Sequence, residues 1–446
     1  MTPSKPPASK PPVPAGQPAL SGPGTMSELA RRRSRMLAWG VLGLTLFACN
    51  LWLAHQAAQR GYVTYVFTQT ILWSVLPYLL ACLMIDRTIH VPSIEGNSLI
   101  GLSTAVPFAA LLGVVLMFHL PYSRGALLLS YGVTLLWLWL GYRRFISRYV
   151  PVFGALDAQA VGTLQAMLDM PGAARPAPAT LRVVRSETEA RQCDGIMLDR
   201  SAPLNDEQAR LLVQLKISHV RIYSVERVGE LLTGRVGLAH IDTEFHDEHV
   251  SRLLFDAFKR LTDIAGALAL LPFALPASLL VALAIRAESS GPVLFRQARM
   301  GRFGRPFTLL KFRSMTHQHG TEHQFAVRDD PRVTRVGRII RKYRLDELPQ
   351  LWNVLAGEMS LIGPRPEIVE IAQRYAQSIP YYPYRHLVRP GLSGWAQVQQ
   401  GYTATDAESV TKLGYDLYYV KHRSLALDLL IAAKTLRTLL TGYGAR

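Results

Sequence analysis

The chain has 446 residues, which is enough for two or three domains that each bury a core of their own. Hydrophobic residues make up 49% of it and charged residues only 18%, which argues against a fully soluble protein and favours one partly in lipid. The formal charge of +17 first suggests nucleic acid. Apolar runs along the chain make an anionic membrane surface and phosphorylated substrates the better partners, and we expect no nucleic-acid partner.

The N-terminal segment, residues 1–34, is predicted to be a disordered basic tail. Pro, Ser, Gly and Ala dominate its first part, and no apolar periodicity is present. An arginine cluster then precedes an apolar run, and no convincing small-residue cleavage site follows that run. The pattern favours a retained membrane anchor over a signal peptide.

Four apolar runs follow, at 37–54, 62–85, 98–119 and 125–141. Each approaches the roughly 20 residues that cross a hydrocarbon core, so we predict a bundle of four transmembrane helices over residues 35–145. Arginines gather before the first run and after the fourth, whereas the loops between the runs carry few. This distribution places both ends of the bundle in the cytoplasm.

Residues 146–250 change in character and are predicted to form a cytosolic α/β, Rossmann-like module with a partly parallel sheet. Short β-type runs alternate there with helical stretches; the β-type runs are Tyr149–Phe153, Leu181–Val184, Gly195–Leu198 and His219–Tyr223. The glycine-rich fingerprint of dinucleotide binding is absent, because only Gly154 is present in the first β-type turn. A regulatory or structural module is therefore favoured over a nucleotide site.

A fifth apolar run, Ile264–Ile285, contains no charged residue. Its length would allow a membrane crossing, but a crossing would put the rest of the chain outside the cell. Pro272 and Pro276 lie one turn apart near its middle, and each removes a backbone donor and crowds the turn before it. Basic residues flank both ends. We therefore predict a re-entrant helix, broken at the two prolines, over about 258–287.

The stretch Arg341–Gly357 carries the clearest chemical signal. Pro349 suits the first turn of a helix and Gly357 suits its C-terminal cap, so Asp346 and Glu347 lie at or just before a helix N-terminus, where anions are favoured. A simple N-cap is the alternative. Against it stands the surrounding positive charge, from Arg338, Arg341, Lys342 and Arg344. Adjacent carboxylates in a basic setting suit phosphoryl chemistry, with one as the nucleophile and one as a Mg²⁺ ligand.

Two further motifs, at 363–367 and 389–397, combine proline and glycine with an arginine. Such turns can hold a guanidinium rigidly against a phosphate, although by themselves they are more often scaffolding.

From about Phe255 to its end, the chain resembles the bacterial sugar transferase family, the polyprenyl-phosphate hexose-1-phosphate transferases. The matching segments occur in the family's order: Gly291–Gln297, Lys311–Met315, Asp346–Gln350, Met359–Glu367 and Arg389–Gln397. The resemblance implies an α-rich monotopic catalytic domain over residues 251–446. The four apolar runs and the α/β module resemble the longer, polytopic members of the family.

The family's activity implies transfer of a hexose-1-phosphate from a UDP-sugar to polyprenyl phosphate, with release of UMP. Asp346 would form an aspartyl phosphosugar intermediate, and Glu347 would bind Mg²⁺. The residues expected to contact the substrates are Lys311, Arg313, Arg341, Gln350, Arg365, Glu367, Arg389 and Gln397.

The resemblance further implies that the protein lies in the bacterial inner membrane, in contact with its lipid, with the catalytic part on the cytoplasmic side. It also implies that the reaction is the first membrane step of exopolysaccharide, capsule or O-antigen assembly. The resemblance is also compatible with a homodimer.

The sequence departs from the family in three places. Leu275 precedes the helix-breaking Pro276 where many members have Ser, and Arg344 stands where many have Ser or Thr, which suggests a different substrate choice. His317, His319 and His323 fall where members usually carry acids, and their loose spacing predicts a solvated loop rather than a metal site.

Three questions stay open at this point. The C-terminal run Leu425–Leu440 fits an amphipathic helix on the membrane and core packing equally well. A non-catalytic sensor or scaffold that binds a nucleotide-sugar is the main alternative function, although an intact Asp-Glu pair argues against it. A hydrolase of diphosphate-linked sugars is the other.

Overall fold

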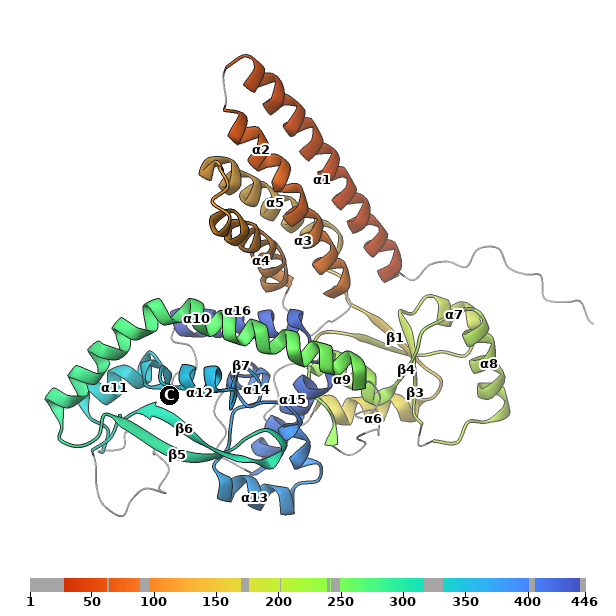
Figure 1. Cartoon of the computed structure of the whole chain (residues 1–446). Helices are drawn as coiled ribbons and strands as arrows, with labels where there is room; N and C mark the ends of the chain where they lie inside the picture. The colour runs from red at the N-terminus through yellow and green to blue at the C-terminus, as the bar shows by residue number, and fades with distance from the viewer. Residues whose placement is uncertain are drawn as a thin grey trace, which may run out of the picture.

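The computed structural model describes residues 28–61, 64–88, 96–169, 176–200, 202–238, 241, 249–316, 332–400 and 406–441. Figure 1 shows three parts: a group of long N-terminal helices, a small α/β module, and a larger helix-rich domain below the long helices. The first helix begins at Glu28, so residues 28–34, which the sequence assigned to the disordered tail, are helical. The arginines after Glu28 extend the first apolar helix instead of preceding it.

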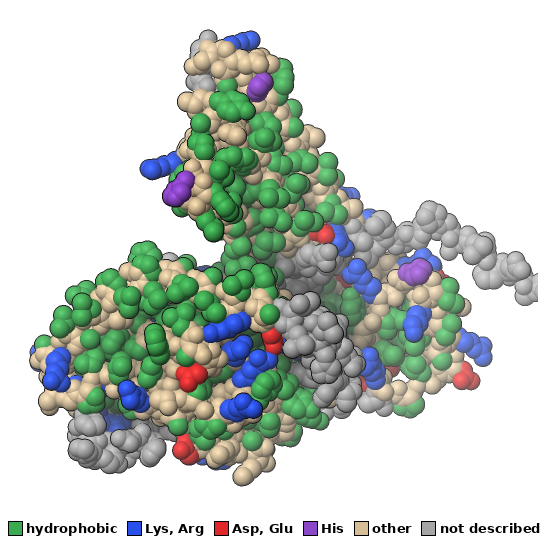
Figure 2. All heavy atoms as spheres, in the orientation of Figure 1, with side chains coloured by type: hydrophobic (Ala, Val, Ile, Leu, Met, Phe, Trp, Pro, Cys, Tyr) green, Lys and Arg blue, Asp and Glu red, His purple; other side chains and the backbone are tan. Residues whose placement is uncertain are grey.

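The N-terminal part consists of α1 (Glu28–Gln59), α2 (Tyr65–Trp73), α3 (Val75–Thr88), α4 (Gly96–Met117) and α5 (Arg124–Phe145). The second apolar run is divided at Ser74 into α2 and α3, which still follow each other as one apolar span. Four spans of this part are long and apolar enough to cross a membrane. Hydrophobic side chains dominate its visible face in Figure 2. Such a surface is compatible with a membrane protein and would be costly in water.

Several polar groups of the N-terminal part are paired across its helices. Trp39 and Trp137 stack with ring centroids 4.1 Å apart, and each indole N–H donates to the other residue's carbonyl, at 2.9 and 3.1 Å. Arg33 donates to both carboxylate oxygens of Asp86, at 2.7 and 2.6 Å. Because α1 is tied in this way to α5 and α3, the helices form one packed unit.

The α/β module contains a four-stranded sheet in the order β2-β1-β3-β4, in which every pair is parallel. The strands are β1 (Val152–Ala155), β2 (Thr180–Val183), β3 (Gly195–Leu198) and β4 (Ile222–Ser224), and the helices are α6 (Ala158–Leu168), α7 (Glu187–Arg191), α8 (Asp206–Ile217) and α9 (Val225–Thr233). Each predicted strand has a counterpart in the sheet, but β1 begins at Val152 and β4 at Ile222, both later than predicted, and the sheet, predicted to be partly parallel, is parallel throughout. A Cβ on Gly154 would lie 2.6 Å from the side chains of Val184 and Ile196. This glycine therefore serves sheet packing.

The C-terminal domain begins with α10 (His249–Glu288) and the antiparallel hairpin of β5 (Leu294–Met300) and β6 (Pro306–Phe312). The remaining elements are η3 (Arg302–Gly304), α11 (Arg335–Lys342), η4 (Leu345–Glu347), α12 (Gln350–Ala356), β7 (Ser360–Ile362), α13 (Val369–Ser378), η5 (Tyr382–Leu387), β8 (Gly391–Ser393), α14 (Trp395–Gln399), α15 (Asp406–His422) and α16 (Leu425–Thr441). The sequence did not predict the hairpin, because neither of its strands has a clear apolar alternation.

Helix α10 runs continuously through Pro272 and Pro276, so the predicted interruption of the helix is wrong. Figure 1 shows that the helix is bent near its middle. A bend is the usual effect of prolines inside a helix, because each one removes a backbone hydrogen bond while the turns on either side remain helical. One face is buried on the domain, at Ala267, Ala274, Val281 and Ile285, whereas the opposite face leaves large apolar side chains exposed, among them Leu268, Phe273, Leu275, Leu279, Leu280 and Leu283.

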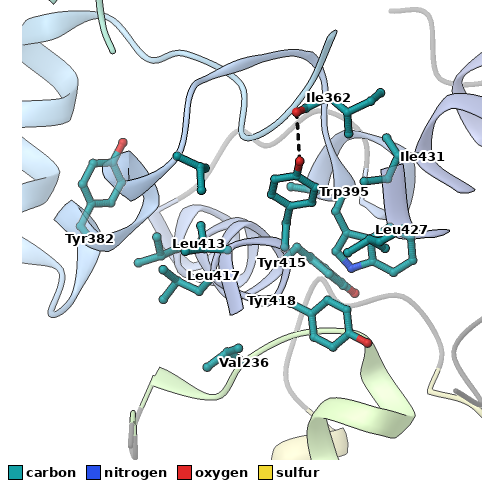
Figure 3. Packing of buried hydrophobic residues seen from close by; sticks show 14 of the residues in the cluster. Val236, Ile362, Tyr382, Trp395, Leu413, Tyr415, Leu417, Tyr418, Leu427 and Ile431 are labelled. Atoms are coloured by element: carbon teal, nitrogen blue, oxygen red, sulfur yellow. Dashed lines mark hydrogen bonds between the residues drawn. The ribbon is translucent and has the colours of Figure 1, made fainter. Parts of the chain in front are cut away.

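The core of the C-terminal domain gathers around Trp395, Tyr415 and Tyr418, as Figure 3 shows. Helix α16 contributes Leu427, Leu430 and Ile431 to this core, so of the two readings of the C-terminal run, core packing is the one observed. The dashed line at Ile362 in Figure 3 is the hydrogen bond that its carbonyl accepts from the Tyr419 hydroxyl, 3.0 Å long.

The α/β module is docked on this domain by buried contacts. Glu230 of α9 is only 3% exposed, and it accepts hydrogen bonds from Lys421 at 3.0 Å and Arg227 at 3.2 Å and contacts His422 at 3.0 Å. Burial raises the pKa of Glu230, but its contacts with His422 and Lys421 outweigh this and lower it. The indole N–H of Trp395 donates to Gly234 O at 2.7 Å. The module and the C-terminal domain therefore share a desolvated interface.

We predict that Glu230→Gln loosens this interface. The substitution would remove the buried anion that Lys421 and Arg227 contact, which should cost about 2 kcal/mol of the free energy of unfolding. Glu187→Gln, which removes a half-exposed carboxylate that pairs with Arg191 in the same module, should cost about 0.5 kcal/mol or less. Thermal unfolding of the detergent-solubilised chain measures both, and equal losses would contradict the prediction.

Candidate active site

The Asp346–Glu347 pair is presented by a tight turn between two short helices. Arg344 adopts a left-handed backbone conformation, with φ 53°, and begins the turn η4 that holds both carboxylates. Pro349 then precedes α12, and Gly357 ends α12 at φ 89°. The predicted helix and its two end signals are confirmed, and the carboxylates lie just before its start.

Glu347 is a buried carboxylate that faces three cations. It is 8% exposed, and its Oε1 accepts a hydrogen bond from Arg365 at 2.8 Å. Lys311 and Arg344 each approach the same oxygen at 3.6 Å. Burial alone would raise the pKa of Glu347, but Arg365, Lys311 and Arg344 outweigh it and lower the pKa to about 2. Glu347 is therefore a permanent anion at neutral pH.

Asp346 has the opposite electrostatic character. Burial and the neighbouring Glu347 anion raise its pKa, against the lowering influence of Lys311, Arg341 and Arg365. Two adjacent carboxylates whose pKa values are pushed apart mark different chemical roles. A poorly solvated carboxylate beside cations suits the role of nucleophile, because those cations can neutralise the phosphate it attacks.

Lys311 reaches the pair from β6. Burial, followed by repulsion from Arg365, lowers its pKa to about 8, although Glu347 and Asp346 act against this. The strand is fixed to α12 by Asn353, whose Oδ1 accepts from Leu310 N at 3.1 Å and whose Nδ2 donates to Thr308 O at 2.8 Å. Asn353 therefore sets the position of Lys311 relative to the carboxylates.

Arg365 comes from the first of the two predicted proline–glycine turns, and the second turn lies directly against it. Gly391 N donates to Pro364 O at 2.9 Å, and Gly363 N donates to Ser393 O at 2.8 Å. A Cβ on Gly391 would lie 2.1 Å from Gly363 N. The glycines are therefore required by the close approach of two backbones, and the result is a rigid support for the Arg365 side chain.

Three predicted contact residues do not join this cluster. Arg313 is buried and donates to Ser289 O at 2.9 Å and Ser290 O at 2.6 Å, so it anchors the end of α10. Glu367 is paired with Lys412. Arg389 donates to Gly357 O at 3.0 Å, at the far end of α12 from the carboxylates.

Of the remaining predicted residues, Arg341 acts on Asp346 through its charge. Gln350 is 2% exposed, and its side-chain Nε2 has no hydrogen-bond partner among the described residues. Gln397 Oε1 is likewise buried and unpaired within the described part.

Sequence reasoning missed several residues that organise the site. In the sequence, Asn353 looks like any polar residue of a helix. Its role in joining β6 to α12 becomes evident only from the structure, where it is 1% exposed. Arg344 was counted among the cations around the pair and noted as a departure from the family, but it was not among the residues expected to contact the substrates. Arg385 and Lys412 lie outside the segments that matched the family, before and after Arg389–Gln397, and no sequence signal singled them out.

The described residues contain no group of three or more His, Cys, Asp or Glu side chains that could hold a metal ion by themselves. A Mg²⁺ ion needs fewer protein ligands, because one or two carboxylates together with substrate phosphates can hold it. Each of the three cations makes its closest approach to Glu347 at Oε1. The pair therefore fits a magnesium ion shared with a phosphate. His317, His319 and His323 lie outside the described residues.

We predict opposite shifts in the pKa of Lys311 in two variants. Glu347→Gln should lower it below about 8, because a stabilising anion is lost, and Arg365→Gln should raise it, because a repelling cation is lost. NMR titration of ¹³C-methylated lysines measures both, with the signal assigned by its absence in Lys311→Arg. Shifts of the same sign in the two variants would mean that Lys311 does not lie between these groups.

The sequence of this chain is similar to those of known proteins. The family model described as bacterial sugar transferase matches residues 254–442. The UDP-N-acetylgalactosamine-undecaprenyl-phosphate N-acetylgalactosaminephosphotransferase of Aeromonas hydrophila is 38% identical over 86% of this chain and 90% of its own length. The UDP-glucose:undecaprenyl-phosphate glucose-1-phosphate transferase of Caulobacter vibrioides is 46% identical over 43% of this chain and 72% of its own length. A transferase of the same name in Escherichia coli is 42% identical over 42% of this chain and 40% of its own length. Because the Aeromonas relative is matched along nearly its whole length, the chain belongs to the bacterial sugar transferase family.

Proposed function

We propose that this chain transfers a hexose-1-phosphate from a UDP-sugar to polyprenyl phosphate, which yields a polyprenyl-diphosphate sugar and UMP. The observation that carries the proposal is the Asp346–Glu347 pair, in which one carboxylate has a raised pKa and the other a lowered pKa beside Lys311 and Arg365. The relatives are named as transferases and give no support to a non-catalytic sensor or scaffold.

In the first step, a carboxylate oxygen of Asp346 attacks the sugar-bearing phosphorus of the UDP-sugar. The bond from that phosphorus to the bridging oxygen breaks, and UMP leaves with that oxygen and its electron pair. Lys311 and Arg365 are close enough to Glu347 to face the same phosphate, and they would neutralise the negative charge that grows on the bridging oxygen.

In the second step, an oxygen of polyprenyl phosphate attacks the same phosphorus and Asp346 leaves as a carboxylate. A Mg²⁺ ion held by Glu347 would supply further charge neutralisation on the diphosphate. Glu347 suits this task because its lowered pKa keeps it ionised. Arg341 and Arg344 add positive charge at the turn itself, where the phosphosugar would be attached.

We further propose that the four N-terminal spans cross the bacterial inner membrane, that the α/β module and the catalytic domain are cytoplasmic, and that α10 enters only one leaflet. The support comes from the packing of α10. Arg260, near its start, donates to Val354 O and Leu355 O, and Ile285, near its end, packs with Phe312 and Ile340. Because one face of the helix is covered by the domain along most of its length, a crossing would draw that domain into the lipid.

UDP-N-acetylgalactosamine is the donor to assay first, since the Aeromonas relative is named for it. We expect Asp346→Asn to reduce transfer of its labelled sugar phosphate to polyprenyl phosphate by about 10³-fold or more, because an amide is a poor nucleophile. The same variant should lose the exchange of labelled UMP into UDP-sugar without acceptor, a reaction that requires the enzyme-bound intermediate.

Glu370→Gln, which changes an exposed carboxylate in the same domain, is the matched control and should retain both activities. Transfer that survives Asp346→Asn in protein correctly inserted in membranes would remove Asp346 from the nucleophile role. Release of free sugar phosphate without any lipid-linked product would instead indicate a hydrolase.

The topology can be tested with single cysteines placed in a chain whose Cys49, Cys82 and Cys193 are replaced by serine. Arg305→Cys, in the β5–β6 turn, should react with a membrane-impermeant maleimide only in inverted vesicles. Arg60→Cys, between the first two spans, should react only in right-side-out vesicles. Reaction of both positions from the same side would show that α10 crosses the membrane. Exchange of the two results, with Arg60→Cys reacting only in inverted vesicles and Arg305→Cys only in right-side-out vesicles, would show that the N-terminal spans are inverted.

A further inference from the structure

A second buried charge network contacts the backbone of Arg365. At its centre is Arg385 of η5, whose side chain is 2% exposed. Its guanidinium donates to Asp416 Oδ2 at 2.7 Å and to the Tyr382 hydroxyl at 2.8 Å. A buried guanidinium is costly unless such partners compensate the lost hydration, so the network has a well-defined geometry.

The third partner of Arg385 connects this network to the site. Its Nη2 donates to the main-chain carbonyl of Arg365 at 2.8 Å, and the Arg365 side chain in turn donates to Glu347 at 2.8 Å. Arg299 acts in the same way one residue later, by donating to Pro366 O at 3.0 Å. The backbone around Arg365 is thus held by two guanidinium groups, of which Arg385 is the one bonded to Arg365 itself.

We propose that Arg385, oriented by Asp416 and Tyr382, is a positioning residue for the transfer reaction: it fixes the Arg365 backbone so that the Arg365 guanidinium meets Glu347. The inference rests on the proposed function for its catalytic consequence, but its structural part can be measured without turnover. Arg385 itself touches no reacting group and acts only through Arg365.

The geometry explains why arginine is needed at this position. A guanidinium is a planar fork whose donors can serve three acceptors at once, and here these are a carboxylate, a hydroxyl and a main-chain carbonyl. An ammonium group on the shorter lysine side chain would keep the ion pair with Asp416 but could not span all three acceptors. Arg385→Lys therefore preserves the buried charge and removes the fork.

The test uses the full-length protein with Arg385→Lys and, as a second and milder variant, Tyr382→Phe, which deletes one hydroxyl. Burial lowers the pKa of Lys311 to about 8, and repulsion from Arg365 contributes to this lowering, so the pKa of Lys311 reports the position of Arg365. We expect both variants to raise this pKa towards its value in Arg365→Gln, and Arg385→Lys to raise it more. This readout does not depend on activity, so it remains valid even if the proposed function fails.

Transfer assays provide the second readout. We expect Arg385→Lys to lower kcat by about tenfold with a smaller change in KM, and to have little further effect in an Arg365→Gln background, because its influence passes through Arg365. Arg260→Lys is the matched control, since the Arg260 guanidinium also holds main-chain carbonyls, those of Val354 and Leu355, but has no contact with Arg365. The control should not change the pKa of Lys311.

Two results would overturn the proposal. The first is an unchanged Lys311 pKa in a folded Arg385→Lys protein. The second is a loss of kcat that is equally large with and without Arg365, which would show that Arg385 supports the fold in general. A wild-type protein without lipid-linked product would refute the proposed function instead, and the titration would still decide the structural claim.

Discussion

The arrangement of the catalytic domain depends on a buried carboxylate that must be surrounded by cations. Glu347 is 8% exposed, and a desolvated anion at this position would be strongly destabilising without Arg365, Lys311 and Arg344. Each cation arrives from a different segment of the chain. The hairpin, the η4 turn and the proline–glycine turn before α13 must therefore all be in place before Glu347 has its partners.

Most of the domain can be understood as the means of bringing these segments together. Asn353 joins β6 to α12 and so positions Lys311, while the contact of β7 with β8 and the Arg385 network hold the backbone of Arg365. Arg260 and Arg389 contact carbonyl groups at the other end of α12. The short helix is thus fixed at both ends, which is necessary because seven residues form an α-helix of little stability on their own.

The other two parts of the chain are connected to this domain by direct packing. The α/β module meets α15 through the buried Glu230, and it meets α14 through the hydrogen bond from Trp395 to Gly234. Helix α4 of the apolar part packs against α16, whose inner face lies in the core of the domain. Since α15 and α16 both contribute to that core, changes in the module or in the apolar helices can be transmitted to the scaffold of the site.

The sequence by itself determined the features that depend on local chemistry. Apolar runs of sufficient length, the alternation of strands and helices in the module, and the Pro349 and Gly357 signals at the ends of α12 each follow from a short segment, and the motifs identified the family. Only the tertiary structure decided which charged residues meet. Lys311, Arg344 and Arg365 gather at Glu347, whereas Arg313, Glu367 and Arg389, with equally suitable side chains, bind elsewhere. The physical reason is that each charged side chain pairs with the buried group that lies within its reach. Packing between segments far apart in the chain decides which group that is.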